Sequence, residues 1–238
     1  MVSIVTSIYL DFLSKFGVGG AHPGGIQLTK ELFKSETITP TTHILDVGCG
    51  TGQTAAYLAA QYGAIVTGID NNPVMVEKAK TRMARYQLPV KIIQGSIENS
   101  PLKEETFDLI ISESVLSFVN KPRSLTEIFR LLKSSGRFIA NELTINQRID
   151  PSHKKEITQF YGLDSLLLER DWITLLQRTG FKGIKIHKQE PLSQQNLTPE
   201  FYYSDYIEPE LYTIMNQHVY IMAKYQGVLD YRVFSCAK

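Results

Sequence analysis

The sequence predicts an α/β fold built on a seven-stranded, mostly parallel sheet with helices on both faces. Two observations lead to this prediction. Short apolar runs of strand length alternate along the chain with amphipathic segments of helix length. The runs are nearly continuously apolar, which is typical of strands buried on both faces, as in parallel sheets whose crossover connections are helices.

Each predicted element has its own local signal. The strands are expected at residues 44–47, 64–69, 90–93, 107–111, 137–140, 184–186 and 231–235. A helix at 53–62 is ended by Gly63, and the next begins at Pro73 with Asn72 as its cap. Apolar residues spaced three and four apart predict a helix within 120–133, and another spans 172–179 before Gly180.

Two segments lie outside this alternation, and we treat both as candidate lids on a single domain, 1–238. Residues 1–40 are predicted as an N-terminal helical cover, with helices at 8–16 and 26–33 joined by the glycine-rich stretch 17–25. Residues 188–225 form an insertion before the last strand, with a helix that begins at Pro209. We assign no element to the polar stretch around His153.

Composition excludes several classes of protein. The 25 basic and 24 acidic residues leave a net charge of +1, so no global field indicates a nucleic-acid or membrane partner. Two cysteines rule out a disulfide scaffold and a cysteine-built zinc site. No leader peptide is apparent, and no run approaches the roughly 20 apolar residues of a membrane span. We therefore expect a cytoplasmic protein.

The densest chemical signal is a glycine loop between the first strand and the helix that follows, Asp46-Val47-Gly48-Cys49-Gly50-Thr51-Gly52. Glycines allow a tight turn and a close approach of the backbone to a ligand. The spacing is G-x-G-x-G, so it matches neither the dinucleotide fingerprint nor a P-loop. With no lysine and an acidic Asp46, the loop suits a cationic ligand. Asp70 closes the next strand, where a carboxylate can bind both hydroxyls of a ribose.

These residues resemble the first motif of class I S-adenosylmethionine-dependent methyltransferases. The similarity covers residues 40–145 in order, through Gly68-Ile69-Asp70-Asn71, Gln94-Gly95-Ser96, the stretch 107–112 and the stretch 131–138. The resemblance implies a Rossmann-like fold, S-adenosylmethionine as cofactor and S-adenosylhomocysteine as product. The subgroup is similar to small-molecule methyltransferases of the quinone-biosynthesis type.

The resemblance also implies cofactor contacts. The loop Gly48, Cys49, Gly50 and Gly52 would line the methionine part and the ribose, and Asp46 would help to hold the amino group. Asp70 would bind the ribose hydroxyls. The adenine would be flanked by Asn71, Gly95, Ser96 and Ile97. Ser96 stands where the family often has an acidic residue, so either Ser96 or Glu98 would reach the adenine amino group. Ser114 would contact the methionine end through its backbone, or simply cap its loop.

The methyl acceptor is expected at the carboxyl ends of the fourth and fifth strands, beneath the lids. Glu113 is a candidate substrate ligand there. Glu142 follows an apolar strand, where burial would raise its pKa and make it a general base, or where it would bind neighbouring backbone amides instead. His22 in the glycine-rich loop is a second catalytic candidate, with a turn residue as the alternative. The other histidines are expected to be structural or solvated, and none makes a metal site with a carboxylate.

The tyrosines are unevenly distributed. Six of the twelve lie in the insertion: Tyr202, Tyr203, Tyr206, Tyr212, Tyr220 and Tyr225. As a lid, rings such as Tyr202 and Tyr206 would line a flat, partly apolar acceptor pocket, with Tyr9 closing it from the other side. The alternatives are packing on the sheet edge, or a contact between two copies of the chain, so a monomer or a homodimer is expected.

Sequence features narrow the acceptor class. Neither cysteine stands in the Pro-Cys context that cytosine C5 methylation needs, and the stretch 112–115 lacks the Pro-Pro-aromatic motif of enzymes that methylate base amino groups. A small organic acceptor remains the leading prediction, with methyl transfer by in-line displacement. The alternative is a protein that binds S-adenosylmethionine without transferring its methyl group, as a sensor or a supporting subunit.

Overall fold

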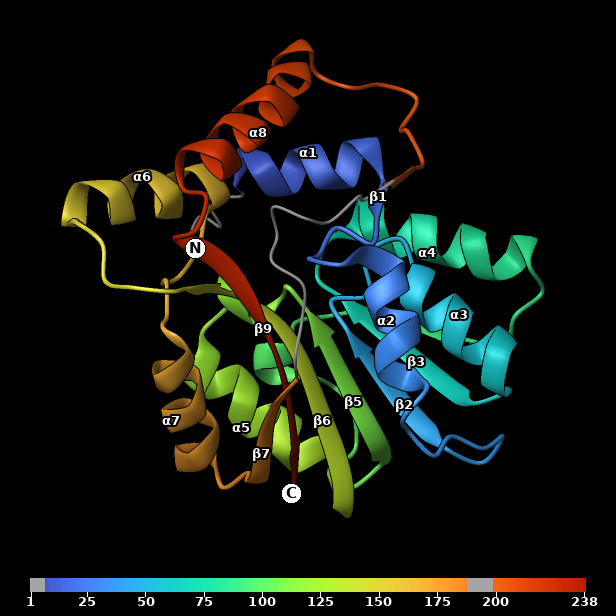
Figure 1. The fold of residues 1–238 in the computed structure, drawn as a ribbon. Helices are drawn as coiled ribbons and strands as arrows, with labels where there is room; N and C mark the ends of the chain where they lie inside the picture. Colours follow the sequence, from blue (N-terminus) through green and yellow to red (C-terminus); the bar gives the residue numbers. More distant parts are fainter. Residues whose placement is uncertain (1–6, 188–198) are drawn as a thin grey trace.

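The computed structural model describes residues 7–187 and 199–238, and a seven-stranded sheet lies at its centre (Figure 1). The strand order is β4-β3-β2-β5-β6-β9-β7. The strands are β2 (His43–Val47), β3 (Ile65–Asp70), β4 (Lys91–Gln94), β5 (Phe107–Glu113), β6 (Leu132–Ile145), β7 (Lys182–His187) and β9 (Leu229–Ala237). All pairs from β4 to β6 are parallel, and β9 runs antiparallel between β6 and β7. The predicted sheet is confirmed.

Helices cover both faces of this sheet. One face carries α2 (Gly25–Phe33), α3 (Gln53–Tyr62) and α4 (Pro73–Arg85), and the other carries α5 (Lys121–Leu131) and α7 (Glu169–Thr179) (Figure 1). Ile110 packs in the apolar cluster of α5 and α7, whereas its neighbour Ile111 packs in the cluster of α2 and α3. This alternation is the pleat of a strand buried on both faces, as the continuous apolar run predicted.

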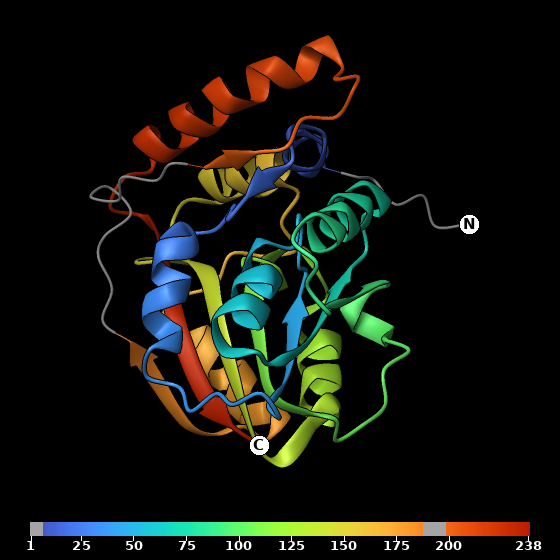
Figure 2. The same cartoon turned by 90° about the vertical axis from the view of Figure 1, so that its right-hand side faces the viewer.

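A third layer, which we call the roof, lies beyond the carboxyl ends of the parallel strands (Figures 1 and 2). It consists of α1 (Ile8–Phe16), α6 (Pro151–Tyr161), the 3₁₀ helix η4 (Pro209–Thr213), α8 (Ile214–Lys224), and a two-stranded ribbon of β1 (Val18–Gly19) and β8 (Glu200–Phe201). The roof has an apolar cluster of its own, which joins Phe12 and Phe16 to Leu211 and Ile214, and it shares a second cluster with the ends of β6 and β9. The predicted helices at 8–16 and from Pro209 are confirmed as elements of this roof.

Three features differ from the prediction. Helix α2 packs on the sheet beside α3 rather than in the roof, with Phe33 fully buried. Helix α6 was not predicted, although Asp150 caps it, Pro151 is its first residue, and Ile157 and Tyr161 form a buried pair one turn apart. Strand β6 is longer than the predicted 137–140, because β9 pairs with it as far as Ile145.

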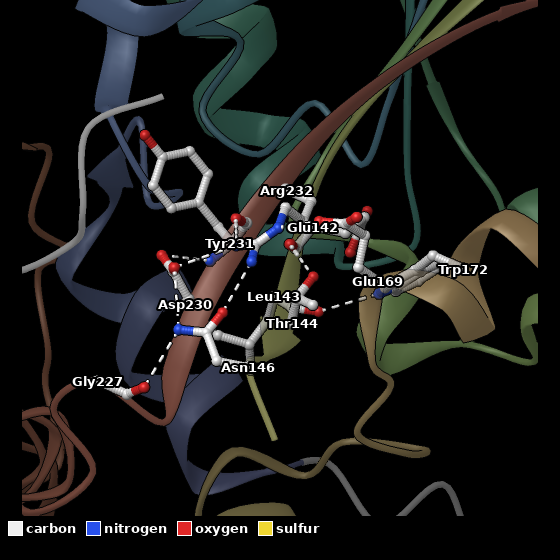
Figure 3. Close-up of polar contacts among 10 residues, drawn as sticks. All are labelled: Glu142, Leu143, Thr144, Asn146, Glu169, Trp172, Gly227, Asp230, Tyr231 and Arg232. Atoms are coloured by element: carbon white, nitrogen blue, oxygen red, sulfur yellow. Dashed lines mark hydrogen bonds and ion pairs between the residues drawn. The ribbon is translucent and has the colours of Figure 1, made fainter. Parts of the chain in front are cut away.

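The extended end of β6 is fixed by polar contacts with β9 and α7 (Figure 3). The guanidinium of Arg232 in β9 donates to Glu169 Oε2 at 2.6 Å and to Asn146 Oδ1 at 2.8 Å. The indole of Trp172 donates to the Leu143 carbonyl at 3.2 Å. These bonds hold the outer part of β6 to β9 and α7. Within the described residues, no helix combines the length and apolar character that a membrane span requires.

Candidate functional site

The glycine loop lies where the strand order reverses, between β2 and β5, which is the usual ligand site of such sheets. The amides of Gly48 and Cys49 donate to the Ile69 carbonyl at 2.7 and 3.1 Å, which ties the loop to β3. Gly48, Gly50 and Gly52 have φ angles of +64°, +52° and +77°. This left-handed backbone is the tight turn for which glycine was expected.

The three glycines serve different purposes. A Cβ on Gly48 would lie 2.3 Å from the Val115 side chain, and one on Gly52 would lie 2.7 Å from Met83, so both positions are closely packed. A Cβ on Gly50 would meet nothing within 4 Å. The backbone of Gly50 is therefore open to a ligand.

Asp70 ends β3 beside this open position. Its Oδ2 accepts from the Gly50 amide at 2.8 Å, and its Oδ1 accepts from the Asn72 amide at 2.8 Å. Burial raises the pKa of Asp70, and these amide donors partly oppose the shift. A carboxylate oxygen has more than one acceptor site, so both oxygens of Asp70 keep capacity for a hydroxyl pair.

Asp46 carries an unsatisfied acceptor at the start of the glycine loop. It is 2% exposed, and its Oδ2 has no hydrogen-bond partner. Burial, followed by repulsion from Glu113 and Asp70, raises the pKa of Asp46 well above its usual range. An ammonium donor would satisfy this oxygen. The residues thus fit S-adenosylmethionine: Asp46 would take its amino group and Asp70 its ribose, with open space over Gly50.

Cofactor binding is expected to be linked to a proton at Asp46. Its raised pKa keeps the carboxyl protonated to higher pH than an ordinary aspartate, whereas an ammonium ligand favours the ionised form. Binding should therefore release a proton, and affinity should rise as pH rises through the raised pKa. Calorimetric titration in two buffers of different ionisation enthalpy counts that proton. If Asp46→Asn released as many protons on binding as wild type, the assignment of this proton to Asp46 would be contradicted.

The segment after β4, predicted to edge the adenine, lies next to Asp70. The Gly95 amide donates to the Asp70 carbonyl at 2.9 Å. The Ser96 hydroxyl accepts from the Glu98 amide at 3.1 Å, and Ile97 is only 4% exposed. Glu98 itself accepts from the Asn120 amide at 3.0 Å, which ties it to α5. Contact of this segment and of the exposed Asn71 with an adenine ring stays a prediction.

Glu113, predicted as a substrate ligand, instead joins two helices to β5. Its Oε1 accepts from the Thr29 hydroxyl of α2 at 2.6 Å, and its Oε2 accepts from the Thr54 hydroxyl of α3 at 2.7 Å. The His22 Nε2 lies 3.5 Å from Oε2, and both side chains are 6% exposed. These contacts favour a structural role for Glu113 over direct contact with an acceptor.

His22 is buried rather than placed at an open mouth. Its Nδ1 lies 3.2 Å from the Pro23 carbonyl and 3.3 Å from the Asn141 side-chain nitrogen. The Asn141 nitrogen also donates to Pro23 at 2.8 Å. His22, Glu113 and Asn141 therefore form one buried cluster at the carboxyl ends of β5 and β6, which sequence reasoning treated as separate residues.

Ser114 follows β5 with a φ of +59°, an uncommon angle for a residue with a side chain. Its amide donates to the Asn141 carbonyl at 2.7 Å. The turn is thus held in a strained conformation beside the glycine loop, as occurs at ligand sites. This position is compatible with the predicted backbone contact to the cofactor. Because the Ser114 amide is already bonded to Asn141, that contact would be made by the Ser114 carbonyl.

Glu142, the other predicted catalytic residue, is fully buried and surrounded by donors. Its Oε1 accepts from the Ser112 hydroxyl and from the amides of Val115 and Leu116 at 3.0–3.2 Å. Its Oε2 accepts from the amide and hydroxyl of Ser117. Burial raises the pKa of Glu142 to about 6, although these hydrogen bonds act to lower it. The contacts favour the structural alternative, in which Glu142 anchors the short helix η2 (Leu116–Phe118).

Glu142→Gln is expected to destabilise the fold by about 1–3 kcal/mol, because its amide nitrogen would face donors that now bind a carboxylate. Urea denaturation measures this loss, with the exposed Glu104→Gln as the control. If Glu142→Gln kept wild-type stability and lost turnover at least about 100-fold, the general-base role would be restored.

The predicted substrate tyrosines lie in different environments. The ring of Tyr9 is enclosed by four others in the roof, with centroids 4.8–6.2 Å away, from Phe12, Phe160, Tyr161 and His218. Tyr202 is 42% exposed and Tyr206 is 66% exposed. The exposure of Tyr206 does not support a role in lining a pocket. Among residues 7–187 and 199–238, no group of three histidine, cysteine or acidic side chains could hold a metal ion.

Comparison with known proteins identifies the family of the chain. Residues 45–140 match the family model described as a methyltransferase domain. An uncharacterized methyltransferase of Bacillus subtilis, YodH, is 39% identical over 233 residues, covering 98% of this chain and 100% of that protein.

Solved structures share the fold at low identity. Phosphoethanolamine N-methyltransferase 2 of Haemonchus contortus superposes with a TM-score of 0.76 at 16% identity, over 97% of this chain and 57% of that one. Geranyl diphosphate C-methyltransferase of Streptomyces coelicolor A3(2) superposes with a TM-score of 0.70 at 13% identity, over 89% and 80%. Given the full-length similarity to YodH and the glycine loop with its two aspartates, the chain belongs to the class I S-adenosylmethionine-dependent methyltransferases.

Proposed function

We propose that this methyltransferase acts on a small organic molecule, bound between the carboxyl ends of β5 and β6 and the roof. The observation that carries the proposal is the open backbone of Gly50, which donates its amide to Asp70 in the loop that begins at the unsatisfied Asp46. The roof lies beyond this end of the sheet (Figure 1). Cover over the carboxyl ends of the strands favours a small molecule over a duplex or a folded protein surface as the acceptor.

S-adenosylmethionine supplies a methyl group on a positively charged sulfur, and the chain's residues hold it for an in-line attack. Asp70 would fix the ribose, Asp46 would receive the amino group, and the loop from Gly48 to Gly52 would lie along the methionine part. Positioning of this kind can contribute up to about 7–11 kcal/mol to catalysis in ideal intramolecular cases. The roof would exclude water from the reacting groups.

The contacts of this site favour an acceptor that needs little help from a general base. Both oxygens of Glu142 are engaged by donors, and His22 is packed against Glu113 and Asn141. A thiolate or a stabilised carbanion can attack a methyl sulfonium without prior proton removal. The named acceptors of the similar proteins, phosphoethanolamine and geranyl diphosphate, support a small organic molecule as the class.

The proposal is tested by supplying S-adenosylmethionine with an isotope-labelled methyl group together with a cell extract separated by mass into small and large molecules. We expect label in one or a few compounds of the small-molecule fraction, identified by mass spectrometry. Label that enters only protein or nucleic acid would overturn the small-molecule assignment.

A further inference from the structure

The ribbon of β1 and β8 joins two parts of the chain that are far apart in sequence. Val18 pairs with Phe201 and Gly19 pairs with Glu200, and the Tyr202 amide donates to the carbonyls of Phe16 and Gly17 (Figure 2). Val18 and Phe201 pack in the apolar cluster of α1, η4 and α8. By its apolar contacts, the ribbon therefore belongs to the roof.

The ribbon meets the layer of α3 and α4 through polar side chains. Lys78 of α4 is 7% exposed, and its ammonium donates to the carbonyls of Lys15 and Tyr202. Burial lowers the pKa of Lys78 to about 8. Arg82 lies one helical turn further along α4 and donates to Glu200 Oε2 at 2.8 Å. At this point the roof and the layer of α3 and α4 are joined by hydrogen bonds.

Arg82 holds the cofactor loop as well. Its Nε donates to the Thr51 carbonyl at 2.8 Å, while its Nη2 binds Glu200. Glu200 Oε2 accepts a second bond, at 2.7 Å, from the side chain of Gln53. Thr51 and Gln53 flank Gly52, the last glycine of the loop. The Arg82 guanidinium therefore connects the ribbon to the cofactor loop. The Glu200 carboxylate of the ribbon accepts from both Arg82 and Gln53.

We propose that Arg82 is a positioning residue that couples the conformation of the cofactor loop to closure of the ribbon. The inference rests on the cofactor site described above. A cofactor that fixes the loop also fixes the Thr51 carbonyl. This carbonyl orients Arg82, and Arg82 then binds Glu200 and keeps the ribbon in its closed position. Because coupling is reciprocal, the closed ribbon slows departure of the bound cofactor or product.

Glu200→Ala removes the ribbon's side of this bridge, including the bond from Gln53, and leaves in place the bond from Arg82 to the Thr51 carbonyl. We expect S-adenosylhomocysteine to leave this variant faster by a factor within about 5–150, the usual range of such coupling, with a nearly unchanged association rate. In wild type, S-adenosylhomocysteine should slow amide hydrogen exchange in residues 15–20 and 200–204. In Glu200→Ala that protection should be absent.

Two further variants sharpen the test. Glu208→Ala removes the 3.1 Å ion pair with Lys15 inside the roof and leaves the bridge intact, so it should behave as wild type. Arg82→Met keeps a long side chain but has no N–H donor for the Thr51 carbonyl or for Glu200, so it should behave as Glu200→Ala. Equal dissociation rates and equal protection in wild type and Glu200→Ala would overturn the coupling alone. Failure of wild type to bind S-adenosylhomocysteine would overturn the cofactor site as well.

Discussion

Asp70→Ala is expected to weaken binding of S-adenosylhomocysteine by at least about 100-fold. In the proposed site the carboxylate would accept two hydroxyl hydrogen bonds, and bonds to a charged group contribute about 1.5–3 kcal/mol each. The substitution also leaves the amides of Gly50 and Asn72 without the acceptor that shapes the loop. Calorimetric titration of the product into wild type and variant measures the change in dissociation constant.

Asp108→Ala is the matched control for that substitution. Asp108 is likewise an aspartate in a sheet strand that accepts a backbone amide, from His43 at 2.9 Å, and it binds Lys133 at 2.8 Å. It lies near the opposite end of its strand from the glycine loop. Asp108→Ala should lose stability and keep its affinity. Affinity within threefold of wild type in Asp70→Ala would contradict the role of Asp70.

Gly50→Ala is expected to weaken cofactor binding while the protein still folds with only a small loss of stability. The new methyl group would meet nothing within 4 Å, so its cost to the cofactor-free protein is the left-handed backbone alone, about 1–2 kcal/mol. In the complex the same methyl group would occupy space needed by the ligand. An overpacked contact costs about 1–3 kcal/mol, which corresponds to about 5- to 150-fold weaker binding.

Gly183→Ala isolates the backbone cost. Gly183 has a φ of +58°, and a Cβ there would also meet nothing within 4 Å, but it lies in β7 at the far edge of the sheet. Both variants should melt at similar temperatures, and only Gly50→Ala should lose affinity for S-adenosylhomocysteine. Equal affinity in the two variants would place the cofactor elsewhere.

The sheet could be predicted because each parallel strand must be apolar on both faces, as Ile110 and Ile111 show. The full length of β6 could not, since its outer part is defined by antiparallel pairing with β9 and not by its own apolar pattern. Helix α6 has cap signals at Asp150 and Pro151, but it contains too few apolar residues to show a helical pattern in the sequence. Such a helix is stabilised chiefly by tertiary contacts.

The cofactor loop could be predicted because its conformation is local: glycines with positive φ follow a strand and precede a helix. The roles of Glu113 and Glu142 could not be settled by sequence. Their hydrogen-bond donors come from α2, α3, β5 and η2, which only the fold brings to them. The ribbon could not be predicted for a related reason. Each of its strands has only two residues, too few to show a strand pattern, and each is defined by its pairing with the other.

Catalysis is tested most directly by counting S-adenosylhomocysteine formed per molecule of protein when S-adenosylmethionine is supplied with the small-molecule fraction of a cell extract. We predict many molecules of product per chain in wild type, no increase without the fraction, and far less product in Asp70→Ala than in Asp108→Ala. Wild-type protein that binds S-adenosylmethionine but never exceeds the background rate of product formation would contradict methyl transfer to a small molecule.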